Sequence, residues 1–203
     1  MSEERCGWCL SEQLYIDYHD SEWGRPCYDD QALFEQLSLE GAQAGLSWIT
    51  ILRKRENYRK LFFDFDIDRL SRMRQAGVER CLQDPGIVRH RGKIEGLVTN
   101  ARIVRDMRKE GDDFAQFLWS FVDYQPKQNK HRTLKTVPSK TAESEAMSKA
   151  LKKRGFKFCG PTICYAFMQA AGMVNDHVFG CKQHAVCKKL GQPSKMPAGW
   201  PGR

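Results

Sequence analysis

The sequence predicts an all-α protein, because apolar residues recur at helical spacing along most of the chain and no segment shows the alternation of β-branched residues that is typical of strands. Residues that favour helix starts precede these segments, and glycines follow several of them. Of the 203 residues, 41% are hydrophobic and 11% are aromatic, which indicates a folded core. We expect a single domain over residues 1–181 and a basic, poorly ordered tail over residues 182–203.

Five helices are expected between residues 29 and 121. The longest periodic segment covers residues 87–110, and Gly111 ends it. The expected starts of the other four are Asp29 or Asp30, Ser47, a residue near Asp66, and Asp112 or Asp113. A polar connection rich in Lys and Arg then covers residues 124–140, and a connection of that length is uncommon unless it is functional or mobile.

Residues 141–172 have the pattern of two helices joined by a tight turn. Thr141 can cap the first helix, whose acidic residues lie in its first turns and whose basic residues lie in its last, as the helix dipole favours. Pro161 opens the second helix and Gly172 ends it. Two helices joined in this way can direct backbone N–H groups at a phosphate, although an ordinary αα-hairpin of an all-α protein has the same pattern.

The overall charge favours the phosphate-binding interpretation. Lys and Arg number 33 against 25 Asp and Glu, a net charge of +8, which is common in proteins that bind a polyanion such as nucleic acid. No apolar run approaches the ~20 residues that would span a bilayer, and the polar start without a secretion segment predicts a cytoplasmic protein. There, the eight cysteines are expected to be core residues or metal ligands rather than disulfides.

Cysteine and histidine residues near the two ends of the chain form a candidate metal site. Cys6 and His19 lie near one end; His177 and Cys181 lie near the other, at a spacing that one helical turn would place on the same face. Two imidazoles and two thiolates suit one structural zinc ion. Spacing alone also allows other sets, such as Cys6, Cys9, Cys181 and Cys187 with His184 as a spare, and it allows cysteines that simply pack in the core.

Aromatic residues and one glutamate form a second candidate site. Glu40 lies among small residues that permit close approach of a ligand. Five aromatic residues can build an electron-rich pocket with it: Trp8, Tyr15, Tyr18, Trp23 and Trp48. Such a pocket would favour a desolvated cation by about 1–2 kcal/mol. The alternative is that the aromatic side chains belong to the core and that Glu40 lies on a helix surface.

Nine sequence blocks are the most specific feature of the chain. They are RCGW (5–8), YIDYHDSEWG (15–24), LEG (39–41), QAGLSWIT (43–50), KRENYR (54–59), GIVRHRGKI (86–94), FLWSF (117–121), KKRGFKF (152–158) and VNDH (174–177). Together they resemble the 3-methyladenine DNA glycosylase I family, within the superfamily of helix–hairpin–helix DNA glycosylases. The resemblance covers residues 5 to 181 and implies that fold, with the hairpin at about 141–172.

The resemblance also implies roles for individual residues. In the family a zinc ion joins the two ends of the chain, and its ligands fall on Cys6, His19, His177 and Cys181. Recognition of the base falls on Glu40, Tyr18 and Trp48, with Trp8 and Tyr15 as further contacts. The candidate DNA contacts are Lys157, Gly160 and Thr162 in the hairpin and Leu46, which is either a core residue or a wedge that fills the gap left by an extruded nucleotide.

Two positions depart from the superfamily pattern. Asn175 stands where the superfamily usually has a catalytic Asp, and Thr162 stands where members with lyase activity have Lys. We therefore expect hydrolysis without a lyase step. The sequence leaves open which group stabilises the oxocarbenium-like sugar.

The function implied is that of a monomeric DNA repair enzyme with Glu40 as its catalytic carboxylate. It would hydrolyse the N-glycosidic bond of 3-methyladenine in double-stranded DNA, release free 3-methyladenine and leave an abasic site. Two alternatives are a non-catalytic, zinc-stabilised DNA-binding module and a glycosylase of the same fold that acts on another base.

Overall fold

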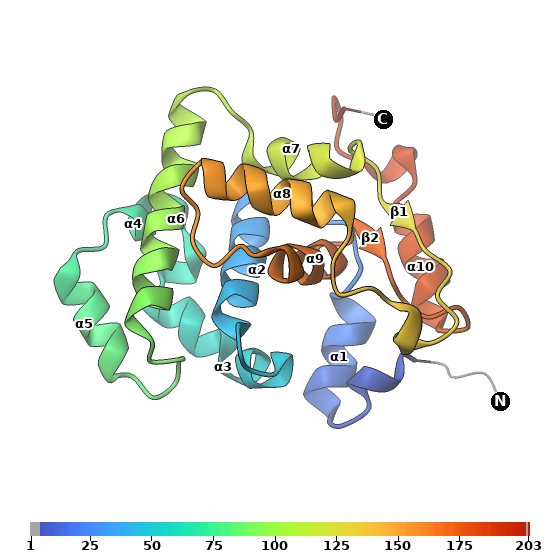
Figure 1. Ribbon diagram of the computed structural model, residues 1–203, viewed down its shortest axis with the longest axis horizontal. Helices are drawn as coiled ribbons and strands as arrows, with labels where there is room; N and C mark the ends of the chain where they lie inside the picture. The colour runs from blue at the N-terminus through green and yellow to red at the C-terminus, as the bar shows by residue number, and fades with distance from the viewer. Residues whose placement is uncertain (1–4, 202) are drawn as a thin grey trace.

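The computed structural model describes residues 5–201 and 203, and it confirms the all-α prediction (Figure 1). Its helices are α1 (Gln13–Ser21), α2 (Asp30–Gln43), α3 (Trp48–Leu61), α4 (Ile67–Ser71), α5 (Gln75–Gln83), α6 (Arg91–Lys109), α7 (Phe114–Trp119), α8 (Ala142–Lys153), α9 (Pro161–Ala170) and α10 (Lys182–Leu190). Two short strands, β1 (Lys127–Gln128) and β2 (Val174–Asn175), form a parallel pair. None of the helices described in residues 5–201 and 203 has the length and apolar character needed to cross a membrane.

The predicted capping residues account for several helix starts. Asp29, Asp66 and Asp113 accept hydrogen bonds from backbone N–H groups in the first turns of α2, α4 and α7, as predicted. The longest helix, α6, starts four residues later than residue 87, with His90 as its cap. The sequence patterns did not predict α1, α5 and α10, because each has nine residues and only two or three buried side chains, which is too few for a clear periodic signal.

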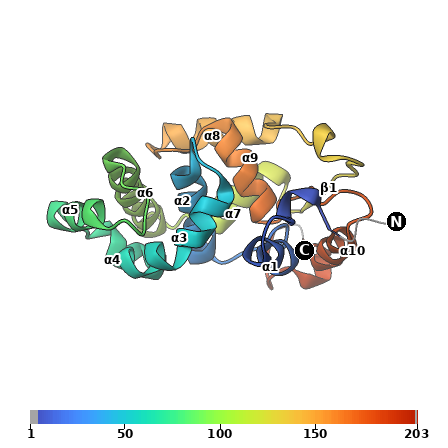
Figure 2. The ribbon, with the colours of Figure 1, turned by 90° about the horizontal axis from the view of Figure 1, so that it is seen from below.

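Helix α2 is the central element of the fold. It packs against α3, α6, α7 and α9, and eight of its 14 residues are buried. Figure 1 shows α4, α5 and α6 at one end of the molecule and α1, α10 and the strand pair at the other, and Figure 2 shows the same division from below. The segments near the two ends of the chain therefore lie side by side at one end of the molecule.

The turn between α8 and α9 is fixed by side-chain hydrogen bonds. Asn100 of α6 donates to the carbonyl of Lys157 at 3.0 Å and accepts from its N–H at 2.8 Å. Ser148 Oγ donates to the carbonyl of Cys159 at 2.6 Å. Phe158 has a left-handed backbone, with φ of +53°. The predicted tight turn is therefore confirmed, and the side chain of Lys157 remains exposed.

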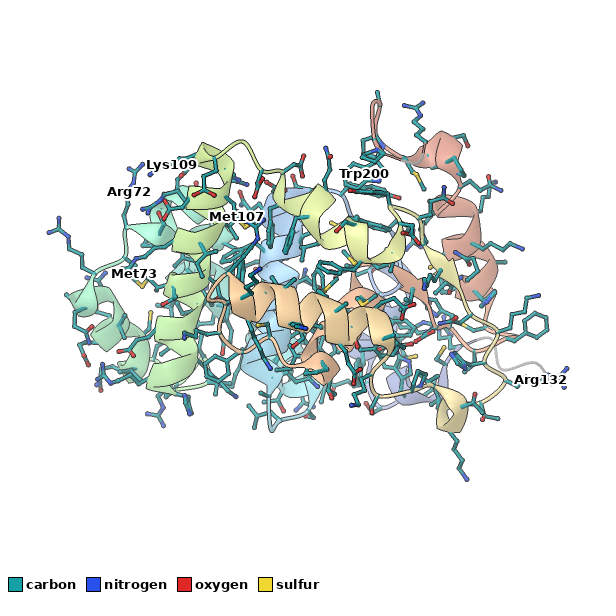
Figure 3. The ribbon with its side chains drawn as sticks, turned by 45° about the horizontal axis from the view of Figure 1, so that its top comes forward. Arg72, Met73, Met107, Lys109, Arg132 and Trp200 are labelled. Carbon is teal, nitrogen blue, oxygen red and sulfur yellow. The ribbon has the colours of Figure 1, made fainter. Side chains whose placement is uncertain are left out.

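The end of the chain differs from the poorly ordered tail that its composition predicts. Helix α10 begins at Lys182, and Trp200 is only 7% exposed. Figure 3 shows Trp200 next to α7. Its ring centroid lies 4.9 Å from that of Tyr28 and 6.2 Å from that of Trp119, and its Nε1 donates to the carbonyl of Tyr124 at 3.3 Å. One apolar anchor thus orders a segment whose composition is otherwise polar.

This anchor predicts a loss of stability when the ring is removed. We expect Trp200→Ala to lower the free energy of unfolding by about 3 kcal/mol, the usual order for truncation of a buried aromatic residue, measured by urea unfolding. Val186→Ala is the control, because Val186 is a 38% exposed residue of α10 and its truncation should have little effect. Equal urea midpoints for Trp200→Ala and the unsubstituted protein would show that the tail contributes nothing to the fold.

Candidate active site and metal centre

A cavity of about 340 Å³ lies between α1, α2, α3 and α9. That volume falls in the range of small-molecule binding sites. The cavity is lined by Trp8, Tyr15, Tyr18, Trp23, Glu40, Gln43, Trp48, Leu134, Val137, Ala166, Gln169 and Asp176. The structure therefore brings all five predicted aromatic residues and Glu40 to one cavity, and Glu40 is buried rather than exposed on a helix surface.

The aromatic side chains form two connected groups in the cavity wall. Trp8 packs edge-on against Tyr15 and Trp23, with centroid separations of 4.8 and 5.0 Å. Tyr18 lies 5.5 Å from Trp48, whose buried Nε1 has no hydrogen-bond partner among the described residues. Aromatic faces carry partial negative charge and attract cations, most strongly where water is excluded. The wall is thus suited to a flat, positively charged ligand.

Glu40 is the buried carboxylate of this cavity. It is 5% exposed, it accepts a hydrogen bond from Gln36 Nε2 at 3.1 Å, and it forms no ion pair within the described part of the chain. Burial raises its pKa to about 8, an effect that the Gln36 hydrogen bond opposes. Glu40 is therefore largely protonated at neutral pH in this structure, and a cation that enters the cavity would favour its ionised form.

Residues that the sequence analysis did not identify complete the cavity. Leu134 and Val137 come from the polar connection, Ala166 and Gln169 come from α9, and Asp176 follows β2. Of these five, only Asp176 could have been found from the sequence. It is part of the VNDH block, between Asn175 and His177, which the sequence analysis had already singled out. Asn175 does not line the cavity.

Cys6, His19, His177 and Cys181 form a buried cluster, with their ligand atoms all within 4.8 Å of one another. His177 Nδ1 lies 3.2 Å from His19 Nε2, and each cysteine Sγ lies 3.5 to 3.6 Å from a histidine nitrogen of the cluster. Hydrogen bonding from Cys6, His177 and His19 lowers the pKa of the Cys181 thiol. Two nitrogens and two sulfurs at these separations can hold a metal ion.

The surroundings of the cluster also suit metal binding. His19 Nδ1 lies 2.9 Å from Asp20 Oδ1, and His177 Nε2 lies 3.1 Å from the carbonyl of Trp23, so each imidazole has a partner on the nitrogen that faces away from the cluster. The expectation that one helical turn joins His177 to Cys181 is wrong. Both residues lie outside helices, and Cys181 is the N-cap of α10; the chain reverses between them.

The alternative metal set is not assembled. Cys9 Sγ donates to the carbonyl of Cys6 at 3.0 Å, Cys187 Sγ lies 4.0 Å from the carbonyl of Trp23, and His184 Nε2 lies 2.8 Å from the carbonyl of Asn129. These three side chains are therefore turned toward backbone oxygens rather than toward the cluster.

Two of the four predicted DNA contacts, Leu46 and Thr162, line a second cavity. Leu46 is 43% exposed, so it is not a core residue. It lies with Thr162 on a smaller cavity of about 180 Å³ that shares Glu40, Gln43 and Ala166 with the aromatic cavity. Lys93 of α6 fixes the turn that leads to Leu46, because its Nζ donates to the carbonyls of Ala42 and Ala44 at 2.9 and 2.6 Å. Gly160 is the N-cap of α9.

Comparison with known proteins identifies relatives over most of the chain. Residues 8–184 match the family described as methyladenine glycosylase. DNA-3-methyladenine glycosylase 1 of Escherichia coli is 57% identical over 178 residues, which are 88% of this chain and 95% of that protein. A crystal structure of a 3-methyladenine DNA glycosylase I has a TM-score of 0.87 at 56% identity, and it covers 88% of this chain and 98% of its own. The Staphylococcus aureus glycosylase solved to explain 3-methyladenine recognition has a TM-score of 0.85 at 36% identity, covering 91% and 98%.

The raised pKa of Glu40 predicts how stability depends on pH. Between pH 4.5 and 8 the folded protein keeps the Glu40 proton that the unfolded chain releases. As the pH rises through this range, Glu40 therefore lowers the free energy of unfolding by about 1.4 kcal/mol for each pH unit. We expect Glu40→Gln to lack this slope and to gain stability relative to the unsubstituted protein as the pH rises, in urea unfolding at pH 5 to 8. Glu56→Gln, at a 76% exposed side chain, is the control. Parallel stability curves for Glu40→Gln and the unsubstituted protein would contradict the buried, protonated state.

Proposed function

The chain belongs to the methyladenine glycosylase family, and from this premise we propose how its own residues carry out the reaction. The protein is a DNA-3-methyladenine glycosylase, a DNA repair hydrolase that acts on N-glycosyl bonds. The observation that supports the residue assignments below is the position of Glu40, buried in a cavity with five aromatic side chains.

The substrate itself makes the bond labile. Methylation of adenine at N3 places a positive charge on the base, so the base departs as a neutral molecule when the bond between C1′ and N9 breaks and its electron pair moves to the base. The sugar then carries the positive charge, and water adds to C1′ and releases one proton to solvent. The products are neutral 3-methyladenine and an abasic sugar. The enzyme needs to extrude, hold and recognise the cationic base rather than to protonate it.

We propose that the cavity binds the methylated base between its aromatic walls. Tyr18, Trp48, Trp8 and Tyr15 supply ring faces, which favour a cationic purine over a neutral one by about 1–2 kcal/mol. Glu40 releases its proton to solvent as the charge enters, and its carboxylate accepts a hydrogen bond from the exocyclic amine. Unmethylated adenine brings no charge, so it would leave Glu40 protonated and unable to accept in the same way.

We propose that the surface around Leu46 binds duplex DNA. Leu46 is exposed at the edge of the cavity, where it would enter the gap left by the extruded nucleotide. Lys157 and the α9 N-terminus at Gly160 and Thr162 would contact the phosphate backbone. Thr162 has no amine to form a Schiff base, which supports hydrolysis to an abasic site without strand cleavage.

We propose that the Cys and His cluster holds one structural zinc ion. Its four protein ligands would complete a tetrahedral shell, which leaves no position open for a substrate or a water nucleophile. The ion would join Cys6 and His19, near the start of the chain, to His177 and Cys181, which follow β2. It would thereby support the aromatic wall.

Base release tests the function. We expect the protein to release 3-methyladenine from methylated duplex DNA, as detected by chromatography of free bases. Glu40→Gln should slow release by about 10- to 100-fold, because a hydrogen bond to a charged acceptor is lost, while affinity for undamaged DNA stays the same. An equal loss in both assays would contradict a role for Glu40 in base recognition. If the unsubstituted protein releases no 3-methyladenine, the proposed function is wrong.

Metal analysis tests the structural ion. We expect about one zinc per chain, and we expect Cys181→Ala to lose the metal and several kcal/mol of stability. Cys9→Ala is the matched control, because Cys9 is a buried cysteine three residues from Cys6 that does not join the cluster. Retention of zinc by Cys181→Ala, or its loss in Cys9→Ala, would contradict the proposed ligand set.

A further inference from the structure

A second carboxylate, Asp176, lies in the wall of the same cavity and has no part in the function proposed above. It is 1% exposed. Its Oδ1 accepts a hydrogen bond from Asn129 Nδ2 at 2.6 Å, and its Oδ2 accepts from the Tyr165 hydroxyl at 2.6 Å and from Gln169 Nε2 at 2.8 Å. His131 Nε2 lies 3.5 Å from Oδ1. Both oxygens of this carboxylate therefore have hydrogen-bond donors from the protein itself.

These hydrogen bonds fix the orientation of the Gln169 amide. The Gln169 amide donates from Nε2 to Asp176 Oδ2, so its NH₂ group is turned toward Asp176 and its oxygen away. Gln169 lines the cavity, and no residue in the described part of the chain donates to its Oε1. That oxygen is accessible, since it accepts no hydrogen bond and yet is absent from the buried polar atoms that lack a partner. The cavity thus contains a neutral acceptor in a set orientation.

The neighbouring Asn175 has a different role. Its Nδ2 donates to Gln128 Oε1 at 2.8 Å and to the carbonyl of His184 at 3.0 Å, so it ties β2 to β1 and to α10. It is 1% exposed and does not line the cavity. The polar group that this segment directs at the cavity wall is therefore one residue further along, at Asp176.

We propose that Gln169 and Asp176 form a pair that determines specificity for a 6-amino purine, an inference that rests on the proposed function. The exocyclic amine of methylated adenine has two N–H donors. Glu40 accepts from one, and Gln169 Oε1 accepts from the other. Asp176 is a positioning residue that holds Gln169 in its accepting orientation. A purine with an oxygen at position 6 places that oxygen against the Gln169 acceptor and is rejected, since the amide cannot turn without breaking its bond to Asp176.

Binding of free bases tests the pair. Isothermal titration calorimetry would compare 3-methyladenine with 3-methylhypoxanthine, which has an oxygen in place of the amine. We expect Gln169→Met to weaken binding of 3-methyladenine by about tenfold and to strengthen binding of 3-methylhypoxanthine, which no longer meets the amide oxygen. Asp176→Asn frees the amide to turn, so it should weaken binding of 3-methyladenine and strengthen that of 3-methylhypoxanthine. Gln75→Met is the matched control, because Gln75 Nε2 also donates to a carboxylate, Glu79 Oε1 at 2.7 Å, on α5 at the other end of the molecule (Figure 1).

The ratio of the two affinities decides the outcome. If Gln169 has a purely structural role, Gln169→Met weakens binding of both ligands equally and leaves the ratio of their affinities unchanged. That result overturns the proposal. If Asp176→Asn does not fold, the ratio in Gln169→Met decides alone. If the unsubstituted protein releases 3-methyladenine but the affinity ratio is the same in Gln169→Met, only the proposed role of Gln169 and Asp176 is contradicted. Failure of the unsubstituted protein to release or bind 3-methyladenine would contradict the proposed function itself.

Discussion

The junction of the two ends of the chain around the Cys and His cluster is the constraint on which the binding cavity depends. His19 and His177 approach to 3.2 Å, and the indole rings of the cavity wall pack directly on them, with Trp8 5.3 Å from His19 and Trp23 4.6 Å from His177. Helix α1 carries His19 and also Tyr15 and Tyr18. Its orientation, and with it the aromatic wall, therefore depends on a junction between segments that are distant in sequence, and a metal ion there would act on the cavity without touching a ligand.

Two carboxylates in one cavity have opposite environments. Glu40 accepts one hydrogen bond from a neutral amide, and burial raises its pKa to about 8. Asp176 accepts from three donors. Such differences in environment are how proteins give different roles to identical chemical groups. Glu40 is free to exchange its proton for the charge of a ligand, whereas Asp176 is held by its three hydrogen bonds and orients its neighbours.

The polar connection between β1 and α8 is joined by backbone hydrogen bonds to the segment that follows α9. Asn129 donates from its backbone N–H to the carbonyl of Asn175, and Phe179 donates likewise to that of His131 at 2.7 Å. Leu134 and Val137 can therefore line the cavity, while the basic side chains of the connection remain exposed. Figure 3 shows Arg132 at the outer edge of the molecule. A connection of this length is usually functional or mobile, and here it forms part of the cavity wall.

The sequence by itself determined the all-α class, the helices α2 to α4 and α6 to α9, and the grouping of Glu40 with aromatic residues as a candidate pocket, because helical period, capping residues and residue type are local properties. The family resemblance added which cysteines and histidines belong together. Only the tertiary structure decided that the tail is anchored by Trp200, that Leu46 is exposed, and that His177 and Cys181 meet without a helix. The same is true of the pairing of Asp176 with Gln169. These features depend on which distant groups the fold brings within hydrogen-bonding or van der Waals distance, and residue type and spacing do not encode that distance.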